Sequence, residues 1–141
     1  MPLFKKHKNM DIINKELLLQ KAAETKNTEV KIINTKNIMP FGNQVAVFNG
    51  YEHNANVSFF LVNFSKGVGP KKHRHPYEET FVILEGEIEA IVNGKTFTVS
   101  AGNIMIVPPN AWHEFSNKTD NIVKTINIHP AAKMIQEWYT E

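Results

Sequence analysis

The sequence contains no cysteine among its 141 residues. Disulfides, thiolate nucleophiles and cysteine-based zinc sites are therefore excluded. An excess of one charge is also lacking, because 16 Lys and Arg residues stand against 14 Asp and Glu residues and leave a net charge of +2. Such a small and scattered charge does not indicate a nucleic-acid-binding protein, so we expect no nucleic acid partner.

Long hydrophobic runs are missing as well. The basic start of the chain, Lys5 to Lys8, is followed by no uninterrupted apolar run and no small-residue cleavage site of the signal-peptide type. The stretch "ELLLQKAA" is too short and too polar to span a bilayer. We therefore expect a cytoplasmic protein that has no membrane partner.

Three segments differ in their local pattern. Residues 1–29 form a lead in which the i, i+4 spacing of apolar residues predicts a short helix from Ile12 to Ala23. Residues 30–129 consist of short β-type runs with turn residues between them. Residues 130–141 begin with Pro130, which suits the first turn of a helix, and predict a C-terminal helix. Many short strands at close spacing predict an all-β sandwich or barrel flanked by these helices.

The register of one hairpin follows directly from the sequence. Asn93-Gly94 is the strongest two-residue turn signal, because both residues tolerate positive φ. A two-residue loop predicts three cross-strand pairs on one face: Val92 with Lys95, Ala90 with Phe97, and Ile88 with Val99. This face is mainly apolar, so we expect it, Phe97 included, to line the interior of the barrel.

Two histidines and a glutamate stand just before an apolar run in "HRHPYEETFVIL". Side chains alternate between the two faces of a strand, so His73 and His75 point the same way. The same alternation places Glu79 rather than Glu78 on the face that Phe81 occupies. Two imidazoles and one carboxylate on one wall are three ligands of a nitrogen–oxygen metal site.

A further histidine starts a later strand in "PPNAWHEFSN". On a barrel, His113 could reach the same ion from the neighbouring strand, with Phe115 on the same face. The alternative is that the first two histidines are exposed loop residues in a basic patch beside Arg74. His129 lies outside both stretches, and we expect it to cap the C-terminal helix rather than to bind metal.

The spacing within both stretches resembles the two motifs of the cupin superfamily. The stretches are Gly67-x5-His73-x-His75-x3-Glu79-x6-Gly86 and Gly102-x5-Pro108-x-Asn110-x2-His113-x3-Asn117. The first agrees with the family pattern at every defined position. The second departs from it at Asn110, where the family has glycine, but asparagine also tolerates the left-handed conformation that such a turn needs.

The resemblance implies a double-stranded β-helix, or jelly-roll, barrel. It also implies that one divalent metal is bound inside the barrel by His73, His75, Glu79 and His113. Three imidazoles and one carboxylate suit Fe, Mn, Ni, Co or Zn, and no residue is assigned to an organic cofactor. The resemblance further implies a small-molecule partner and a homodimer, for which residues 30–48 are the natural contact segment.

The expected inner wall is apolar, which favours a small organic substrate over a sugar phosphate. We predict that Phe81, Phe115 and Tyr77 contact this substrate, although Tyr77 could equally be a packed aromatic residue. Our first hypothesis is a metal-dependent, dioxygenase-like oxidoreductase. The alternatives are a non-catalytic protein that binds or senses a small ligand and a metal-dependent isomerase or lyase. No catalytic base is identified apart from the ligands.

Overall fold

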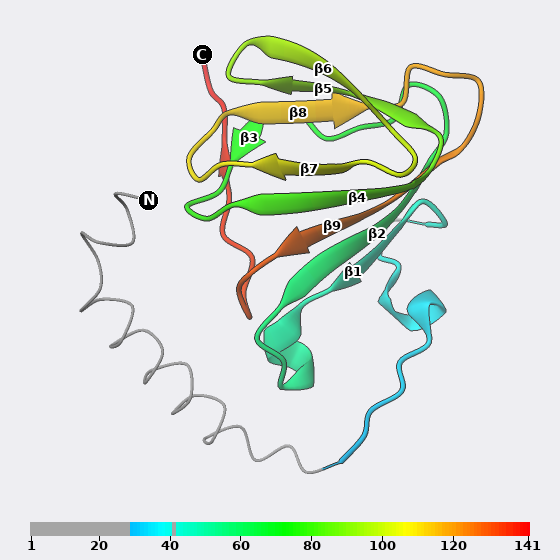
Figure 1. Cartoon of the computed structure of the whole chain (residues 1–141). Coiled ribbons are helices and arrows are strands. Elements are labelled where there is room, and N and C mark those ends of the chain that lie inside the picture. Colours follow the sequence, from blue (N-terminus) through cyan, green and yellow to red (C-terminus); the bar gives the residue numbers. More distant parts are fainter. Residues whose placement is uncertain (1–28, 41) are drawn as a thin grey trace. The chain divides into compact units, whose positions relative to one another are not determined.

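Antiparallel strands are the main secondary structure in the computed structural model, which describes residues 29–40 and 42–141 (Figure 1). Residues 33–141 form one unit. Its elements are η1 (Thr35–Ile38), β1 (Val45–Phe48), η2 (Gly50–His53), β2 (Ser58–Phe64), β3 (His73–Arg74), β4 (Glu79–Glu85), β5 (Glu87–Val92), β6 (Lys95–Ser100), β7 (Ile104–Val107), β8 (His113–Ser116), β9 (Val123–His129) and β10 (Glu137–Trp138). The η elements are single 3-10 turns.

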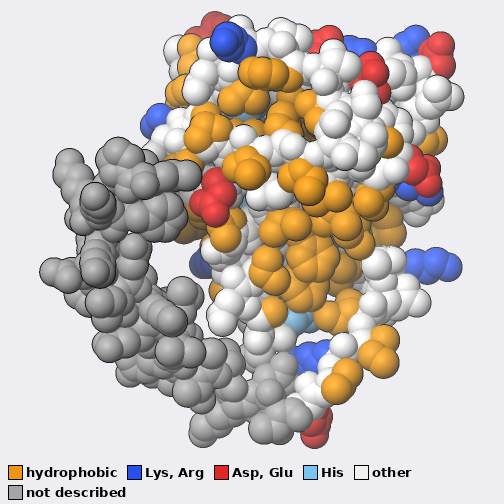
Figure 2. All heavy atoms as spheres, in the orientation of Figure 1, with side chains coloured by type: hydrophobic (Ala, Val, Ile, Leu, Met, Phe, Trp, Pro, Cys, Tyr) orange, Lys and Arg blue, Asp and Glu red, His pale blue; other side chains and the backbone are white. Residues whose placement is uncertain are grey.

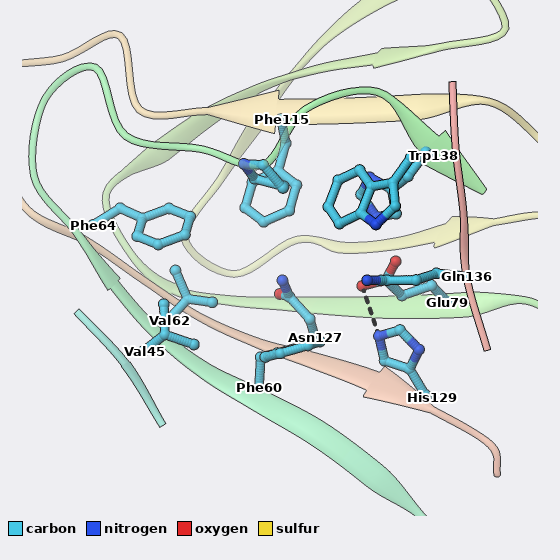
Figure 3. A pocket seen from close by; sticks show the side chains of 12 residues that line it. Val45, Phe60, Val62, Phe64, Glu79, Phe115, Asn127, His129, Gln136 and Trp138 are labelled. Carbon is cyan, nitrogen blue, oxygen red and sulfur yellow. Dashed lines mark ion pairs between the residues drawn. The ribbon is translucent and has the colours of Figure 1, made fainter. Parts of the chain in front are cut away.

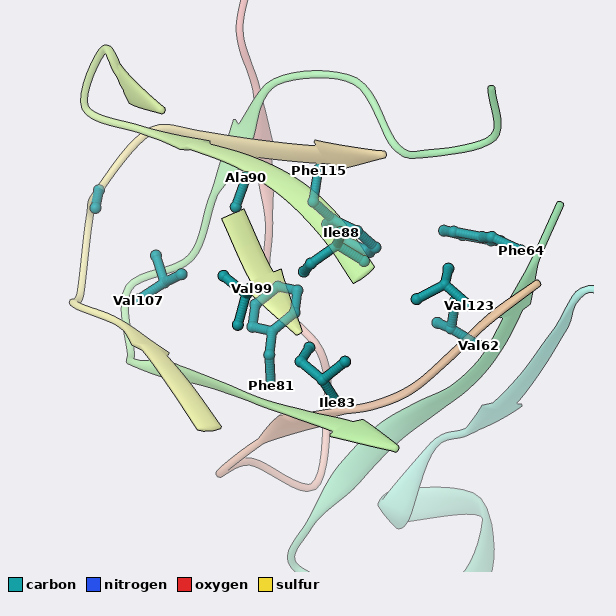
Figure 4. Close-up of a cluster of buried hydrophobic side chains, with 11 residues drawn as sticks. Val62, Phe64, Phe81, Ile83, Ile88, Ala90, Val99, Val107, Phe115 and Val123 are labelled. Carbon is teal, nitrogen blue, oxygen red and sulfur yellow. The ribbon is translucent and has the colours of Figure 1, made fainter. Parts of the chain in front are cut away.

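The described strands form two five-stranded sheets. Their orders are β1-β2-β9-β4-β7 and β10-β3-β8-β5-β6. Side chains alternate along each strand, so that Phe81 and Ile83 of the first sheet meet Ile88 and Phe115 of the second in one buried apolar cluster (Figure 4). The mostly-β jelly-roll architecture expected from the sequence is therefore confirmed.

The hairpin β5–β6 has the predicted register. Residues Asn93 and Gly94 both have positive φ, at 49° and 80°, as a two-residue hairpin loop requires. All three predicted pairs are present. The expectation that Phe97 faces the interior is wrong, because its side chain is 44% exposed. β6 is the outermost strand of its sheet, and of its residues only Val99 is buried.

The predicted C-terminal helix is also wrong. Residues 130–141 contain no helix, and β10 instead pairs antiparallel with β3, which places Trp138 opposite His73. A short isolated helix is marginal in water, whereas an extended segment here completes the open edge of β3. The predicted N-terminal helix, Ile12 to Ala23, lies outside the described residues.

The start of the β segment also differs from the expectation. Residues 30–34, at the start of the segment expected to consist of β-type runs, form no strand, and η1 follows them directly. The segment boundaries at residues 29 and 129 stay predictions. Within the part of the chain that the structure describes, no helix has both the length and the apolar character needed to cross a membrane.

Candidate metal centre

Four motif side chains converge at one end of the barrel. His73 belongs to β3, His75 follows it, and Glu79 and His113 are the first residues of β4 and β8. His73 and His113 are also direct partners across the β3–β8 pair. All four are buried, and one ligand atom from each lies within 4.8 Å of the others. The sequence prediction that these residues lie together is therefore confirmed, and their geometry would allow them to hold an ion.

The alternation along β4 separates two adjacent acids as predicted. The Glu79 side chain is 3% exposed, whereas Glu78 is exposed. The turn before β8 also fits the sequence reasoning. Asn110 has a φ of 64°, in the left-handed region, and its N–H donates to the carbonyl oxygen of His75 at 2.8 Å. This hydrogen bond ties the second motif to the first.

Backbone carbonyls fix the ring orientation of all three motif histidines. The Nδ1–oxygen distances are 2.6 Å from His73 to Lys71, 2.8 Å from His75 to Ile135, and 2.9 Å from His113 to Ala111. A carbonyl oxygen only accepts hydrogen bonds, so each Nδ1 carries the hydrogen. In the neutral rings every Nε2 then presents a lone pair, which is the form that a metal ion binds.

These lone pairs meet a carboxylate. The Nε2 atoms of His75 and His113 lie 3.1 and 2.9 Å from Oε1 of Glu79. Neutral imidazole lone pairs repel a carboxylate oxygen at such distances unless a cation lies between them. A divalent transition metal supplies that cation, and three nitrogens with one oxygen are a suitable donor set for it. The residues present therefore fit a metal ion.

Electrostatics at the cluster also suit a cation. Burial alone would raise the pKa of Glu79, but the ring N–H groups that His113, His129 and His75 direct at the carboxylate when their rings are protonated outweigh burial and hold that pKa well below its usual value in the metal-free protein. Burial, with a smaller contribution from the neighbouring His113 and His75, lowers the pKa of His73 to about 4 against the opposing hydrogen bond to Lys71. The site thus keeps a charged carboxylate beside a neutral imidazole in mildly acidic solution.

We expect the metal-free protein to lose stability as the pH falls from about 6.5 to about 4. His73 has a pKa of about 4 when folded and 6.5 as its ordinary value, so the unfolded chain binds more protons in this range. The depressed pKa of Glu79 acts in the same direction at still lower pH. His73 alone contributes on the order of 3 kcal/mol. Urea denaturation of chelator-treated protein at pH 7, 5.5 and 4.5 measures the effect; constant or rising stability would contradict it.

An apolar cavity of about 310 Å³ opens beside the cluster. In Figure 3, aliphatic and aromatic side chains occupy one end, and Glu79, His129, Gln136 and Trp138 occupy the other. The cavity is lined by Val45, Phe60, Val62, Phe64, Pro70, His73, Glu79, Phe115, Asn127, His129, Gln136 and Trp138. The metal cluster and the apolar space therefore form one connected site.

The three residues predicted to contact the substrate lie in different surroundings. Phe115 lines the cavity, but Phe81 and Tyr77 are not among its lining residues. Phe81 is fully buried and packs edge-on against Phe115, with ring centroids 5.0 Å apart. Tyr77 stacks on His75 at the turn before β4, with centroids 5.4 Å apart. Substrate contact by these residues stays a prediction.

His129 is a site residue that the sequence reasoning missed. It ends β9, is fully buried, and places Nε2 3.3 Å from Oε2 of Glu79. Because the predicted C-terminal helix does not form, the expected capping role is wrong. The alternation in "VKTINIH" was the available signal, since His129 shares the inward face of β9 with Asn127. Because His129 belongs to neither motif, the comparison with the family pattern did not single it out.

The basic residues near the histidines face away from the site. Arg74 forms an ion pair with Glu137 at 2.8 Å and lies over the ring of Trp112 at 4.4 Å. Lys72 lies over the ring of Tyr139 at 4.1 Å. These contacts brace β10 and the residue after it against the outer side of β3. The alternative in which the histidines belong to an exposed basic patch is therefore wrong.

Comparison with known sequences points to the same family as the two motifs do. A family model described as the cupin domain matches residues 60–129. The chain is 34% identical over 63 residues to the polyketide synthase CurC of Streptomyces cyaneus, covering 43% of this chain and 41% of that protein. It is 28% identical over 103 residues to the HTH-type transcriptional regulator PuuR of Escherichia coli strain K12, covering 70% of this chain and 55% of that protein. The chain thus spans about half the length of these curated relatives.

Solved structures share the fold. A double-stranded β-helix protein of Klebsiella pneumoniae has a TM-score of 0.61 at 19% identity, covering 79% of this chain and 93% of that one. The oxalate decarboxylase of Bacillus subtilis, which has Mn(II) centres, has a TM-score of 0.67 at 20% identity over 80% of this chain and 34% of that one. The salicylate 1,2-dioxygenase of Pseudoaminobacter salicylatoxidans has a TM-score of 0.54 at 20% identity over 61% and 27%. At these identities the likeness establishes the fold alone.

Proposed function

This chain belongs to the cupin superfamily, and we propose that it is a metal-dependent, dioxygenase-like enzyme that acts on a small, largely apolar organic molecule. The observation that carries the proposal is the cluster of three carbonyl-fixed imidazoles and one buried carboxylate beside an apolar cavity. His73, His75, Glu79 and His113 would hold one divalent ion, drawn from Fe, Mn, Ni, Co and Zn. Such an ion polarises a coordinated oxygen and, if redox-active, activates dioxygen.

The chain's own residues would bind and orient the substrate. Phe60, Phe64 and Phe115 offer an apolar surface that excludes water from the body of the molecule. Asn127 is 2% exposed, and its Oδ1 accepts a hydrogen bond from Thr125, which leaves its amide N–H groups for a polar substituent. The polar end of the cavity, at Glu79, would receive the oxygen atoms that the ion coordinates.

The size and charge of the cavity narrow the substrate class. A cavity of about 150 Å³ holds benzene, so about 310 Å³ accommodates one ring with a short substituent. Among the described residues, no lysine or arginine lines the cavity. Phosphorylated or multiply charged molecules therefore lack a cationic partner other than the ion. We propose a single-ring or similarly compact molecule with one or two chelating oxygens.

A second candidate function is ligand binding or sensing without catalysis. The observation that favours it is the likeness to a transcriptional regulator over 70% of this chain. The same cavity would then hold an effector, and the ion would anchor it. A redox-silent ion would instead favour an isomerase or lyase. The metal identity in protein purified without added metal separates these chemistries.

We expect the metal-loaded protein to bind salicylate, which carries two oxygen donors on one ring, and to consume dioxygen in its presence. Val62 lines the cavity, so Val62→Phe places a larger side chain there and should weaken salicylate binding at least about tenfold. A misfit of a single methylene group in a hydrophobic pocket already changes discrimination by about 10- to 200-fold. Leu61→Phe, on the opposite face of β2, is the matched control. Calorimetry and an oxygen electrode measure the two effects.

The outcomes separate the two functions. Binding with oxygen consumption, weakened only in Val62→Phe, supports the dioxygenase. Binding without turnover of any kind supports the sensing protein and contradicts the enzyme. No binding of salicylate, benzoate or catechol by metal-loaded protein contradicts the proposed substrate class.

The homodimer also stays a proposal, and a surface other than residues 30–48, the contact segment expected from the sequence, offers an apolar face for it. Apolar side chains alternate with the core-facing residues along the first sheet: Phe59, Leu61, Val82, Leu84, Ile104, Ile106, Ile126 and Ile128. Figure 2 shows hydrophobic side chains gathered where β4, β9 and β2 lie in Figure 1. Ile104 and Ile106 are 66% and 65% exposed. A second copy covering this face would remove such a patch from water.

A further inference from the structure

His129 is the fourth buried histidine of the site, and its surroundings differ from those of the other three. Its Nδ1 lies 2.8 Å from the hydroxyl oxygen of Tyr77, not next to a backbone carbonyl. Its Nε2 has no well-aligned hydrogen bond to any described residue, and it points toward Oε2 of Glu79 at 3.3 Å (Figure 3). A buried polar atom without a good partner calls for an explanation.

The hydrogen positions follow from the partners. The Tyr77 oxygen accepts a hydrogen bond from the N–H of Ile135 at 3.0 Å. Among the described residues, Nδ1 of His129 is the acceptor placed to receive the hydroxyl hydrogen, so Tyr77 donates there. The neutral ring of His129 then carries its hydrogen on Nε2. This tautomer is also the one that suits a neighbouring carboxylate oxygen, whereas a lone pair on Nε2 would repel it.

His129 is thus held in the tautomer opposite to that of the motif histidines. His75 and His113 present Nε2 lone pairs to Oε1 of Glu79, and His129 presents an N–H to Oε2. One residue, Ile135, takes part in both arrangements. Ile135 accepts from Nδ1 of His75 through its carbonyl and donates to Tyr77 through its N–H. The C-terminal segment that was expected to be helical therefore organises the site from both sides.

We propose that Tyr77 and His129 form a positioning pair that holds Glu79 so that Oε1 faces the metal and Oε2 stays bound to His129. This inference rests on the proposed metal site. In this role His129 is not a fifth ligand, because the nitrogen nearest the site carries a hydrogen. Hydrogen bonds at functional sites often tighten when the complex forms, so the contact at 3.3 Å would shorten once an ion draws Oε1. Outer partners of this kind raise metal affinity about 10- to 100-fold.

Substitutions test the pair through metal affinity. His129→Leu removes the N–H, and we expect the affinity for Zn²⁺ in a chelator competition to fall about 10- to 100-fold. His129→Gln retains an N–H donor and should recover part of that loss. Tyr77→Phe removes only the hydroxyl and should also weaken binding. Tyr51→Phe is the matched control, because Tyr51 is 55% exposed and bonds only to Glu52 through its hydroxyl. Affinities equal to that of the unchanged protein in all variants would overturn the proposal.

Nitrogen-15 NMR of the histidine rings tests the tautomer directly and does not depend on whether the substituted proteins fold. In the unchanged protein at pH 7.5, with or without Zn²⁺, His129 should appear as the Nε2–H tautomer. Tyr77→Phe should yield a mixture of both tautomers. An Nδ1–H tautomer of His129 in the unchanged protein overturns the pair. Failure of the unchanged protein to bind Zn²⁺ at all would instead refute the proposed metal site, and the tautomer would still decide the pair.

Discussion

Replacing His75 with alanine is expected to remove most of the bound metal. His75 supplies one of four clustered ligand atoms, and its ring is fixed by the carbonyl of Ile135. Loss of an outer partner alone typically costs about 10- to 100-fold in affinity, so loss of a ligand should cost at least about 100-fold. Glu79→Ala should do the same. The melting temperature in the presence of metal should fall as well, because binding adds to folding stability.

Glu78→Ala is the matched control for this prediction. Glu78 is exposed and adjacent to Glu79, so the two acids differ in little except the face of the chain that they occupy. Elemental analysis of the three proteins, purified side by side, should show metal loss in His75→Ala and Glu79→Ala alone. Equal metal content in all three would mean that the cluster is not a metal site.

Phe81→Ala is expected to lower the free energy of unfolding by about 3–5 kcal/mol. The side chain is fully buried between the sheets and packs on Phe115, so its removal leaves a cavity that the strands cannot close. The loss is a large share of the stability of a domain of this size. It should also weaken metal binding, because Phe81 lies edge-on to His113 with ring centroids 6.3 Å apart. Urea denaturation measures the main effect.

Phe97→Ala is the control for this core substitution. The hairpin pattern alone places Phe97 on the interior face, but its side chain is 44% exposed on an edge strand. We expect its removal to cost less than about 1 kcal/mol, as for surface substitutions. A loss equal to that of Phe81→Ala would indicate that Phe97 is covered in solution, for example by a second copy of the chain.

Three ligands of the metal cluster could be predicted from local sequence, whereas His113, on the distant strand β8, joined them through the expected barrel and the family resemblance. The alternation within β4 selects Glu79 over Glu78, and the spacing of His73 and His75 places them on one face. The Asn93-Gly94 turn fixes its hairpin for the same reason. In each case the period of the strand or the dihedral angles of a two-residue loop decide the outcome, and both can be read from neighbouring residues.

The features that the sequence did not reveal depend on distant contacts. The C-terminal segment follows a helical pattern locally, but pairing with β3 across about sixty positions of sequence overrides that preference. His129 joins the site only because β9 lies beside β4 in the first sheet. Phe97 is exposed because β6 is the outermost strand of its sheet among the described residues. Strand order decides each of these outcomes, and no local pattern encodes it.

Anomalous diffraction from crystals grown with Mn²⁺ or Zn²⁺ tests the central claim most directly. The account predicts one strong peak per chain, bound by Nε2 of His73, His75 and His113 and by Oε1 of Glu79, with bonds of about 2.0–2.3 Å. His129 should lie outside the bonded set. Anomalous peaks found only at surface residues, with the four buried side chains unoccupied at saturating metal, would contradict the account.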